Sequence, residues 1–272
     1  MEYIVLMVLG LLAGTIGSLV GLGGGIVIVP SLLFLSASGF FSEVTPQIAA
    51  GTSLLVIIFT GLSSTIAYYK QKKVDIKTGL ILFMGGGPGG VVGAWANKQL
   101  NADSFSLWFG LFMIFISIVL VYKDKIPPLK RNSEKGVWRT FIESDGIEYT
   151  YGFQPIMAIS IAFVVGFLGG LLGIGGGALM VPSLILLFHF PAHIAVATSM
   201  LLLFFTSLTS SITYIWLGHI IWLYAFALIP GAWIGGTLGA KINQKLPSKT
   251  IVRILRVILV LVGVRLIIDA LL

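Results

Sequence analysis

The chain has 272 residues, of which 57% are hydrophobic and 10% charged, and its mean hydropathy is +1.04. A soluble domain carries roughly 25% charged residues, so this composition predicts a membrane protein and leaves no segment for a separate soluble domain. The net charge is +7, but the basic residues lie in short connections between apolar runs, which indicates membrane orientation rather than nucleic-acid binding. The absence of cysteine excludes disulfides, thiolate metal sites and thiol catalysis.

The first half of the chain is predicted to begin with an apolar segment over residues 3–20, followed by a run of glycines and a short apolar piece over 26–37. Three helix-length runs follow, over residues 46–70, 76–98 and 103–122. At 1.5 Å per residue, the short piece reaches only about 18 Å, which is less than a hydrocarbon core of roughly 30 Å. It is therefore predicted to be a half-helix.

A polar linker over residues 123–152 separates the two halves. Within it, residues 140–151 alternate around the pair Asp145-Gly146, a pattern typical of a β-hairpin. We expect a small hairpin on the cytoplasmic side. The plainer alternative is a tether that only joins the halves.

The second half repeats the order of the first. Its apolar segment (153–172), glycine run and short piece (178–190) are followed by runs over 192–217, 221–244 and 249–271. The segment at 21–32, G-L-G-G-G-I-V-I-V-P-S-L, is repeated at 173–184 as G-I-G-G-G-A-L-M-V-P-S-L. The sequence thus predicts an all-α polytopic membrane protein, with one repeat over residues 1–122 and a homologous one over 153–272.

The distribution of basic residues indicates that the repeats are inverted. Suppose that each glycine-broken unit returns to the face from which it entered. The basic residues at 70–77 (four), in the linker (six) and at 241–256 (five) then share one side. If each glycine-broken unit instead crosses the membrane once, the basic cluster at 241–256 lies on the opposite side from the other two. The positive-inside rule favours the inverted arrangement, with both termini outside.

The consecutive glycines are poor helix formers and interrupt each apolar run. Close helix packing is the plainer explanation for such residues, and it suits the glycines at 85–90 and 235–236. Unwound backbone at membrane depth, however, needs a cavity or a ligand. Each half-helix also points its first amides and the positive end of its dipole at the break. Two such ends entering from opposite faces predict an anion site near the midplane.

Two hydroxyl pairs occupy matched positions in the repeats, Thr52-Ser53 and Thr198-Ser199. Hydroxyls are suitable donors to an oxyanion, although they also commonly bond to carbonyls of their own helix. Together with the breaks, they complete the predicted substrate site, whose members are Gly23, Gly24, Gly25, Ile26, Thr52, Ser53, Gly175, Gly176, Gly177, Ala178, Thr198 and Ser199.

The remaining polar residues of the apolar segments have plainer roles. Asn97 and Asn243 fall at matched helix ends, where capping is expected, and Arg265 with Asp269 forms a pair near the outer face. Every acidic residue falls at a segment end or in the linker, so no carboxylate is placed for a proton relay or a sodium site. With no nucleophile and base and no H-E-x-x-H pattern, we expect no catalytic residue, no metal and no cofactor. G-x-G-x-x-G is incomplete at the breaks, which argues against nucleotide binding.

The motifs together resemble the sulfite exporter TauE/SafE family of prokaryotic membrane proteins. The resemblance rests on the duplicated G-x-G-G-G with P-S-L, the A-x-x-T-S pairs, the N-x-x-L helix ends and the central D-G hairpin, and it covers nearly the whole chain. It implies a permease for sulfite or small sulfonated anions in the cytoplasmic membrane. The positions that match the family's paired motifs are Gly23, Gly24, Gly25, Pro30, Thr52 and Ser53, with Gly175, Gly176, Gly177, Pro182, Thr198 and Ser199.

We therefore expect a secondary transporter that works by alternating access on a small anion, as a monomer or homodimer in the lipid bilayer. An anion channel and a non-transporting membrane subunit are the alternatives.

Overall fold

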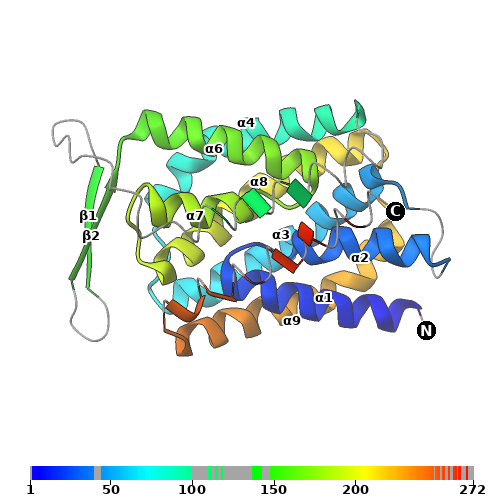
Figure 1. The fold of residues 1–272 in the computed structure, drawn as a ribbon, viewed down its shortest axis with the longest axis horizontal. Coiled ribbons are helices and arrows are strands. Elements are labelled where there is room, and N and C mark those ends of the chain that lie inside the picture. Colours follow the sequence, from blue (N-terminus) through cyan, green and yellow to red (C-terminus); the bar gives the residue numbers. More distant parts are fainter. Residues whose placement is uncertain are drawn as a thin grey trace.

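The structure is a computed structural model that describes residues 2–39, 44–99, 137–142 and 148–247, with isolated helical positions between 110 and 118 and between 249 and 268. Most of the predicted helices over 103–122 and 249–271, the Asp145-Gly146 turn and the Arg265–Asp269 pair lie outside the described residues. Six of the described helices are long and apolar enough to cross a membrane, and two more are apolar but shorter. The chain is thus a multi-pass helical membrane protein with a small β-hairpin, as the sequence predicts (Figure 1).

The helices of the first half begin and end close to the predicted positions. Thr45 caps the first turn of the third helix by accepting from the Ile48 amide, and Asp75 does the same for the fourth through the Thr78 amide. The elements are α1 (Glu2–Val20), α2 (Gly25–Ala37), α3 (Pro46–Lys70), α4 (Ile76–Ala96) and the short 3-10 helix η1 (Asn97–Gln99).

The second half has the same order, with one difference in length. The half-helix α7 ends at Leu186 and not at residue 190 as predicted. His189 takes a left-handed φ of 57°, and Phe190 precedes Pro191, a position where helical backbone is disfavoured. The elements are α6 (Pro155–Leu172), α7 (Gly177–Leu186), α8 (Ala192–Trp216) and α9 (Trp222–Lys245).

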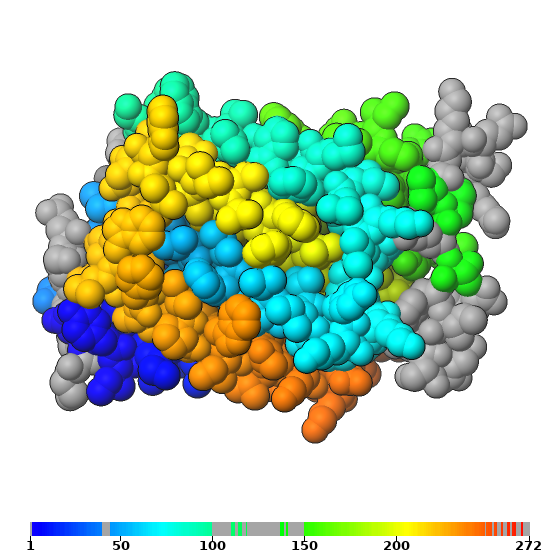
Figure 2. Space-filling view, turned by 180° about the vertical axis from the view of Figure 1, so that it is seen from behind, coloured from blue at the N-terminus to red at the C-terminus, as the bar shows by residue number. Residues whose placement is uncertain are grey.

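The two halves interlock rather than lying side by side. Helix α1 of the first half packs along α9 of the second, and α6 of the second half packs along α4 of the first. Helices α3 and α8 contact each other between these pairs. Figure 2 shows α8 in yellow against α3 in blue, with α4 in turquoise along the upper edge and α9 in orange along the lower edge. The core is therefore shared by both repeats.

The hairpin is docked at one end of the bundle, and the N terminus lies at the other end (Figure 1). Strand β1 (Val137–Ile142) pairs antiparallel with β2 (Glu148–Phe153). The ring of Tyr151 lies 4.1 Å from that of Phe190, and its hydroxyl donates to Asp75 Oδ2 at 3.3 Å. Phe153 packs in the same way on Phe188. Aromatic side chains therefore dock the hairpin on the α7–α8 connection, and the Tyr151 hydroxyl attaches it to the α3–α4 connection.

Candidate functional site

Both breaks follow the same backbone course. In each break, three glycines adopt positive φ angles between 69° and 96°, a region that side-chain-bearing residues rarely enter. They are Gly21, Gly23 and Gly24 in the first break and Gly173, Gly175 and Gly176 in the second. Glycine is therefore required by the backbone conformation at these positions.

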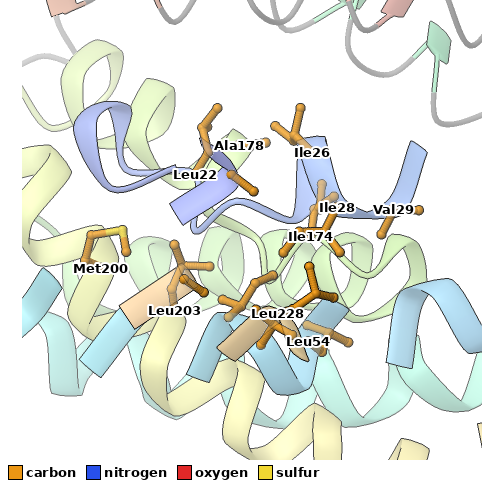
Figure 3. Packing of buried hydrophobic residues seen from close by; sticks show 14 of the residues in the cluster. Leu22, Ile26, Ile28, Val29, Leu54, Ile174, Ala178, Met200, Leu203 and Leu228 are labelled. Atoms are coloured by element: carbon orange, nitrogen blue, oxygen red, sulfur yellow. The ribbon is translucent and has the colours of Figure 1, made fainter. Parts of the chain in front are cut away.

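The two breaks touch each other in the core of the bundle. A Cβ added at Gly25 would lie 2.7 Å from the Gly173 carbonyl oxygen, and one added at Gly177 would collide with the Gly21 carbonyl oxygen. Figure 3 shows the same crossing, with the side chain of Leu22 beside Ala178. The structure thus brings the two predicted glycine segments together at one place, where they are fully buried.

Side chains cap the carbonyl groups at the ends of the helices that lead into the breaks. At the end of α1, the Tyr68 hydroxyl donates to the Ser18 oxygen at 2.8 Å, and Asn243 Nδ2 donates to the Leu19 oxygen at 2.7 Å. At the end of α6, Tyr214 donates to the Gly170 oxygen at 2.9 Å and Asn97 to the Leu171 oxygen at 2.6 Å. Each asparagine thus caps a helix of the opposite repeat and is completely buried. The sequence predicted that the asparagines cap helix ends at the membrane interface, but they are buried and cap other helices, and it made no prediction for the tyrosines.

The first amide groups of the helix that follows each break, unlike these carbonyls, have no hydrogen-bond partner among the described residues. No described residue accepts a hydrogen bond from the first two amides of α2, at Gly25 and Ile26, or from those of α7, at Gly177 and Ala178. The amides of Gly23 and Gly175 differ, because they donate back to α1 and α6. Each break therefore has capped carbonyls and open amides. This arrangement favours an anion over a cation.

The threonine and the serine of each predicted hydroxyl pair lie in different surroundings. Thr52 Oγ1 accepts from the amide of Ile221, just before α9, and Thr198 Oγ1 accepts from the amide of Asp75, just before α4, both at 3.2 Å. Ser199 Oγ donates to the Gly21 oxygen at 2.9 Å, and Ser53 Oγ is buried with no partner in the described chain. The threonines thus tie neighbouring helices together, whereas Ser199 faces a break.

Farther along α3 and α8, beyond the hydroxyl pairs, four residues contact the breaks that the sequence did not single out. Thr206 Oγ1 donates to the Gly175 oxygen at 3.2 Å. Ser207 Oγ and the matched apolar side chains of Ile57 and Leu203 also lie against Gly175. The only sequence signal for them is their position one and two turns after the hydroxyl pairs, on the same helices.

The surroundings of the breaks are electrically neutral. The side chains nearest the positive-φ glycines belong to Val, Ile, Leu, Ala and Ser residues. Among the described residues, no group of three or more His, Asp or Glu side chains could hold a metal ion. Lysines lie only near the ends of the described helices, as at Lys98. Burial, and to a smaller extent the charge of Lys98, lowers the pKa of His219 in the α8–α9 connection.

These features define the class of the protein. It is a polytopic membrane protein in which two short helices start at paired, buried glycine breaks, an architecture typical of transporters. The chain belongs to the family described as Sulfite exporter TauE/SafE, which matches residues 6–266. The family resemblance drawn from the motifs is thereby confirmed.

Individual relatives are also membrane proteins by name. The chain is 59% identical over 270 residues to "Probable membrane transporter protein YunE" of Bacillus subtilis strain 168, covering 99% of this chain and 98% of that protein. It is 26% identical over 261 residues to "Probable membrane transporter protein MJ0441" of Methanocaldococcus jannaschii, covering 90% and 87% of the two chains. No solved structure matches the chain at a significant level.

Proposed function

We propose that this protein is a secondary transporter that moves a small sulfur-containing anion, such as sulfite or a sulfonate, across the cytoplasmic membrane. The anion binds where the two glycine breaks meet. The protein is a permease and not an enzyme, and it needs no metal or cofactor.

One observation carries this proposal. At each break, tyrosine and asparagine side chains satisfy the carbonyls of the entering helix, while the first amides of the following helix have no described acceptor. Buried amides without partners are unfavourable, and they are tolerated at membrane depth where a ligand satisfies them. Since the amides and the helix dipoles both favour negative charge, an anion is the ligand that fits.

The sulfur chemistry of the substrate is supported by the family description and by the neutral surroundings. Donors without a formal charge hold an anion less tightly than ammonium or guanidinium groups do, which suits a substrate that must be released. In this proposal, Ser53 and Ser199 face the breaks, while Thr52 and Thr198 position α9 and α4.

The transport cycle is proposed to use inverted repeats and alternating access. Inversion is supported by the hydrogen bond from Gln71, after α3, to the Ala240 carbonyl of α9. This bond brings the basic residues around 70–77 and 241–245 to the same end of the bundle, as the positive-inside rule favours. Rocking of one repeat against the other would separate the apolar contacts that Ile57 and Leu203 make with the breaks.

A basic cavity supports an anion path at the hairpin end. It has a volume of about 430 Å³, and its charged lining consists of Lys72, Lys73 and Lys77 with one carboxylate, Asp75. Positive charge in a concave surface raises the local concentration of anions. Because these lysines lie on the predicted cytoplasmic side, the cavity is suited to collecting anions for export.

The proposal is tested by sulfite flux into proteoliposomes that contain the purified protein. We expect uptake that saturates with sulfite concentration and exceeds the uptake by empty liposomes. The absence of flux for sulfite and for a panel of small sulfonates would contradict the substrate. Currents of single-channel size in planar bilayers would instead indicate a channel.

A further inference from the structure

Two buried hydroxyl groups of the long helices α3 and α8 have no hydrogen-bond partner among the residues that the structure describes. Ser53 and Ser207 are both 0% exposed, and neither side-chain oxygen has a partner in the described chain. Serine and threonine in a membrane helix normally bond to a carbonyl of the preceding turn, as Ser63 and Thr209 do here. An unpaired hydroxyl in the core is unfavourable, so its position next to open amides requires an explanation.

Ser207 lies directly against the second break. Its Oγ would be 2.9 Å from a Cβ added at Gly175, the residue before the cap of α7. The Gly175 carbonyl already accepts from the neighbouring Thr206. The Ser207 proton is therefore available to a ligand that lies between α8 and the start of α7.

Ser53 occupies the corresponding side of α3. One turn before it, Ala50 touches Gly173, and Val196, one turn before Ser199, touches Gly21 in the same way. The internal repeat thus places Ser53 next to the second break, where its hydroxyl has no partner.

The first break lacks this pair of available hydroxyls. Ser199 already donates to the Gly21 carbonyl, and also lies 3.0 Å from the Val196 oxygen. The position matched to Ser207 is Gly61, which has no side chain and packs against the backbone of Phe204. The two breaks are therefore chemically different, although their backbones are alike.

We propose that the anion binds at the second break, where the α7 amides of Gly177 and Ala178 and the hydroxyls of Ser53 and Ser207 donate to its oxygen atoms. The first break packs against this site and completes its wall. Ser207 is then the residue of the second repeat that determines affinity for an oxyanion. This inference depends on the proposed function and assigns the substrate to one of its two breaks.

The test compares sulfite and methanesulfonate uptake by proteoliposomes of single variants. Ser207→Ala should raise KM about tenfold or more, because a hydrogen bond to a charged acceptor is lost. Ser207→Cys, which keeps the size but donates weakly, should give an intermediate KM. The matched control is Ser211→Ala, because Ser211 is also buried and unpartnered, one helical turn farther from the break. Its KM should equal that of the wild type.

The outcomes separate this inference from the proposed function. If the wild-type protein moves neither anion, the proposed function itself fails. If the wild type transports and Ser207→Ala keeps the wild-type KM, the assignment to the second break is wrong. An equal rise in KM for Ser211→Ala, or a larger rise for Ser199→Ala than for Ser207→Ala, would also overturn it.

Discussion

Tyr68 and Tyr214 each donate a hydrogen bond to a carbonyl at the end of a broken helix, and both side chains are fully buried. Replacement by phenylalanine removes only the hydroxyl and leaves that carbonyl unpaired. We expect Tyr68→Phe and Tyr214→Phe each to lower the free energy of unfolding by about 1–3 kcal/mol. The measurement is thermal or denaturant unfolding of purified protein in detergent.

The control for these variants is Tyr69→Phe. Tyr69 follows Tyr68 in sequence but is 60% exposed, so its hydroxyl is not part of the core. We expect no measurable change in its stability. If all three variants unfold alike, the tyrosines do not cap the helices.

The sequence could predict some of the site residues because their signal is local. Consecutive glycines inside an apolar run are unfavourable in a helix, so the two breaks are visible without a structure. The roles of Tyr68 and Asn243 depend on which helix lies opposite them, and a single sequence does not contain that information. Ser207 is harder still to predict. The matched position in the first repeat is Gly61, so a comparison of the two halves shows no repeated hydroxyl there.

At the scale of elements, two stripes of glycine hold the helices of different repeats together. The glycines of α4 at 85, 89 and 93 meet carbonyl groups of α6, and their matched glycines in α9 at 231, 235 and 239 meet carbonyl groups of α1. Four-residue spacing places such glycines on one helix face, where they let backbones approach closely.

We expect Gly89→Leu and Gly235→Leu to force these helices apart. Overpacking should lower the free energy of unfolding by about 1–3 kcal/mol or more, and should reduce the monodisperse fraction in size-exclusion chromatography. Val92→Leu is the control, since Val92 lies on α4 but is 48% exposed. Normal stability of both glycine variants would show that the close packing is dispensable.

Helix positions were predictable to within a few residues because apolar run length, proline and capping residues are all read along the chain. The half-helix α7 shows where this fails. The apolar run continues to residue 190, but the backbone leaves the helix after Leu186 because of the left-handed His189 and the following Pro191. A run of apolar residues indicates that a segment is buried, not that it is helical. Here the buried segment continues beyond the end of the helix.

For the whole molecule, the internal repeat predicted two equivalent halves, but not their interlocking. The pairing of α1 with α9 and of α6 with α4 depends on surfaces that face each other across the repeats. In such an arrangement each half buries much of its apolar surface against the other half. The two repeats are therefore expected to fold together, and rocking in the transport cycle would have to move interlocked pairs of helices.

The inverted orientation can be tested directly, because the chain has no cysteine and any single cysteine is a unique label. Lys72, Lys98 and Lys245 are exposed positions at helix ends, suited to substitution by cysteine. With inverted repeats, Lys98→Cys should react with a membrane-impermeant maleimide in intact cells. Lys72→Cys and Lys245→Cys should react only after the cells are permeabilised.

Lys72 and Lys245 decide between the two topologies. If each glycine-broken unit crossed the membrane once, these positions would lie on opposite faces and only one of them would require permeabilisation. The Gln71–Ala240 hydrogen bond brings their helix ends together, which favours equal labelling. The cysteine-free parent protein gives the background, and opposite labelling of Lys72→Cys and Lys245→Cys would rule out two breaks that enter from opposite faces.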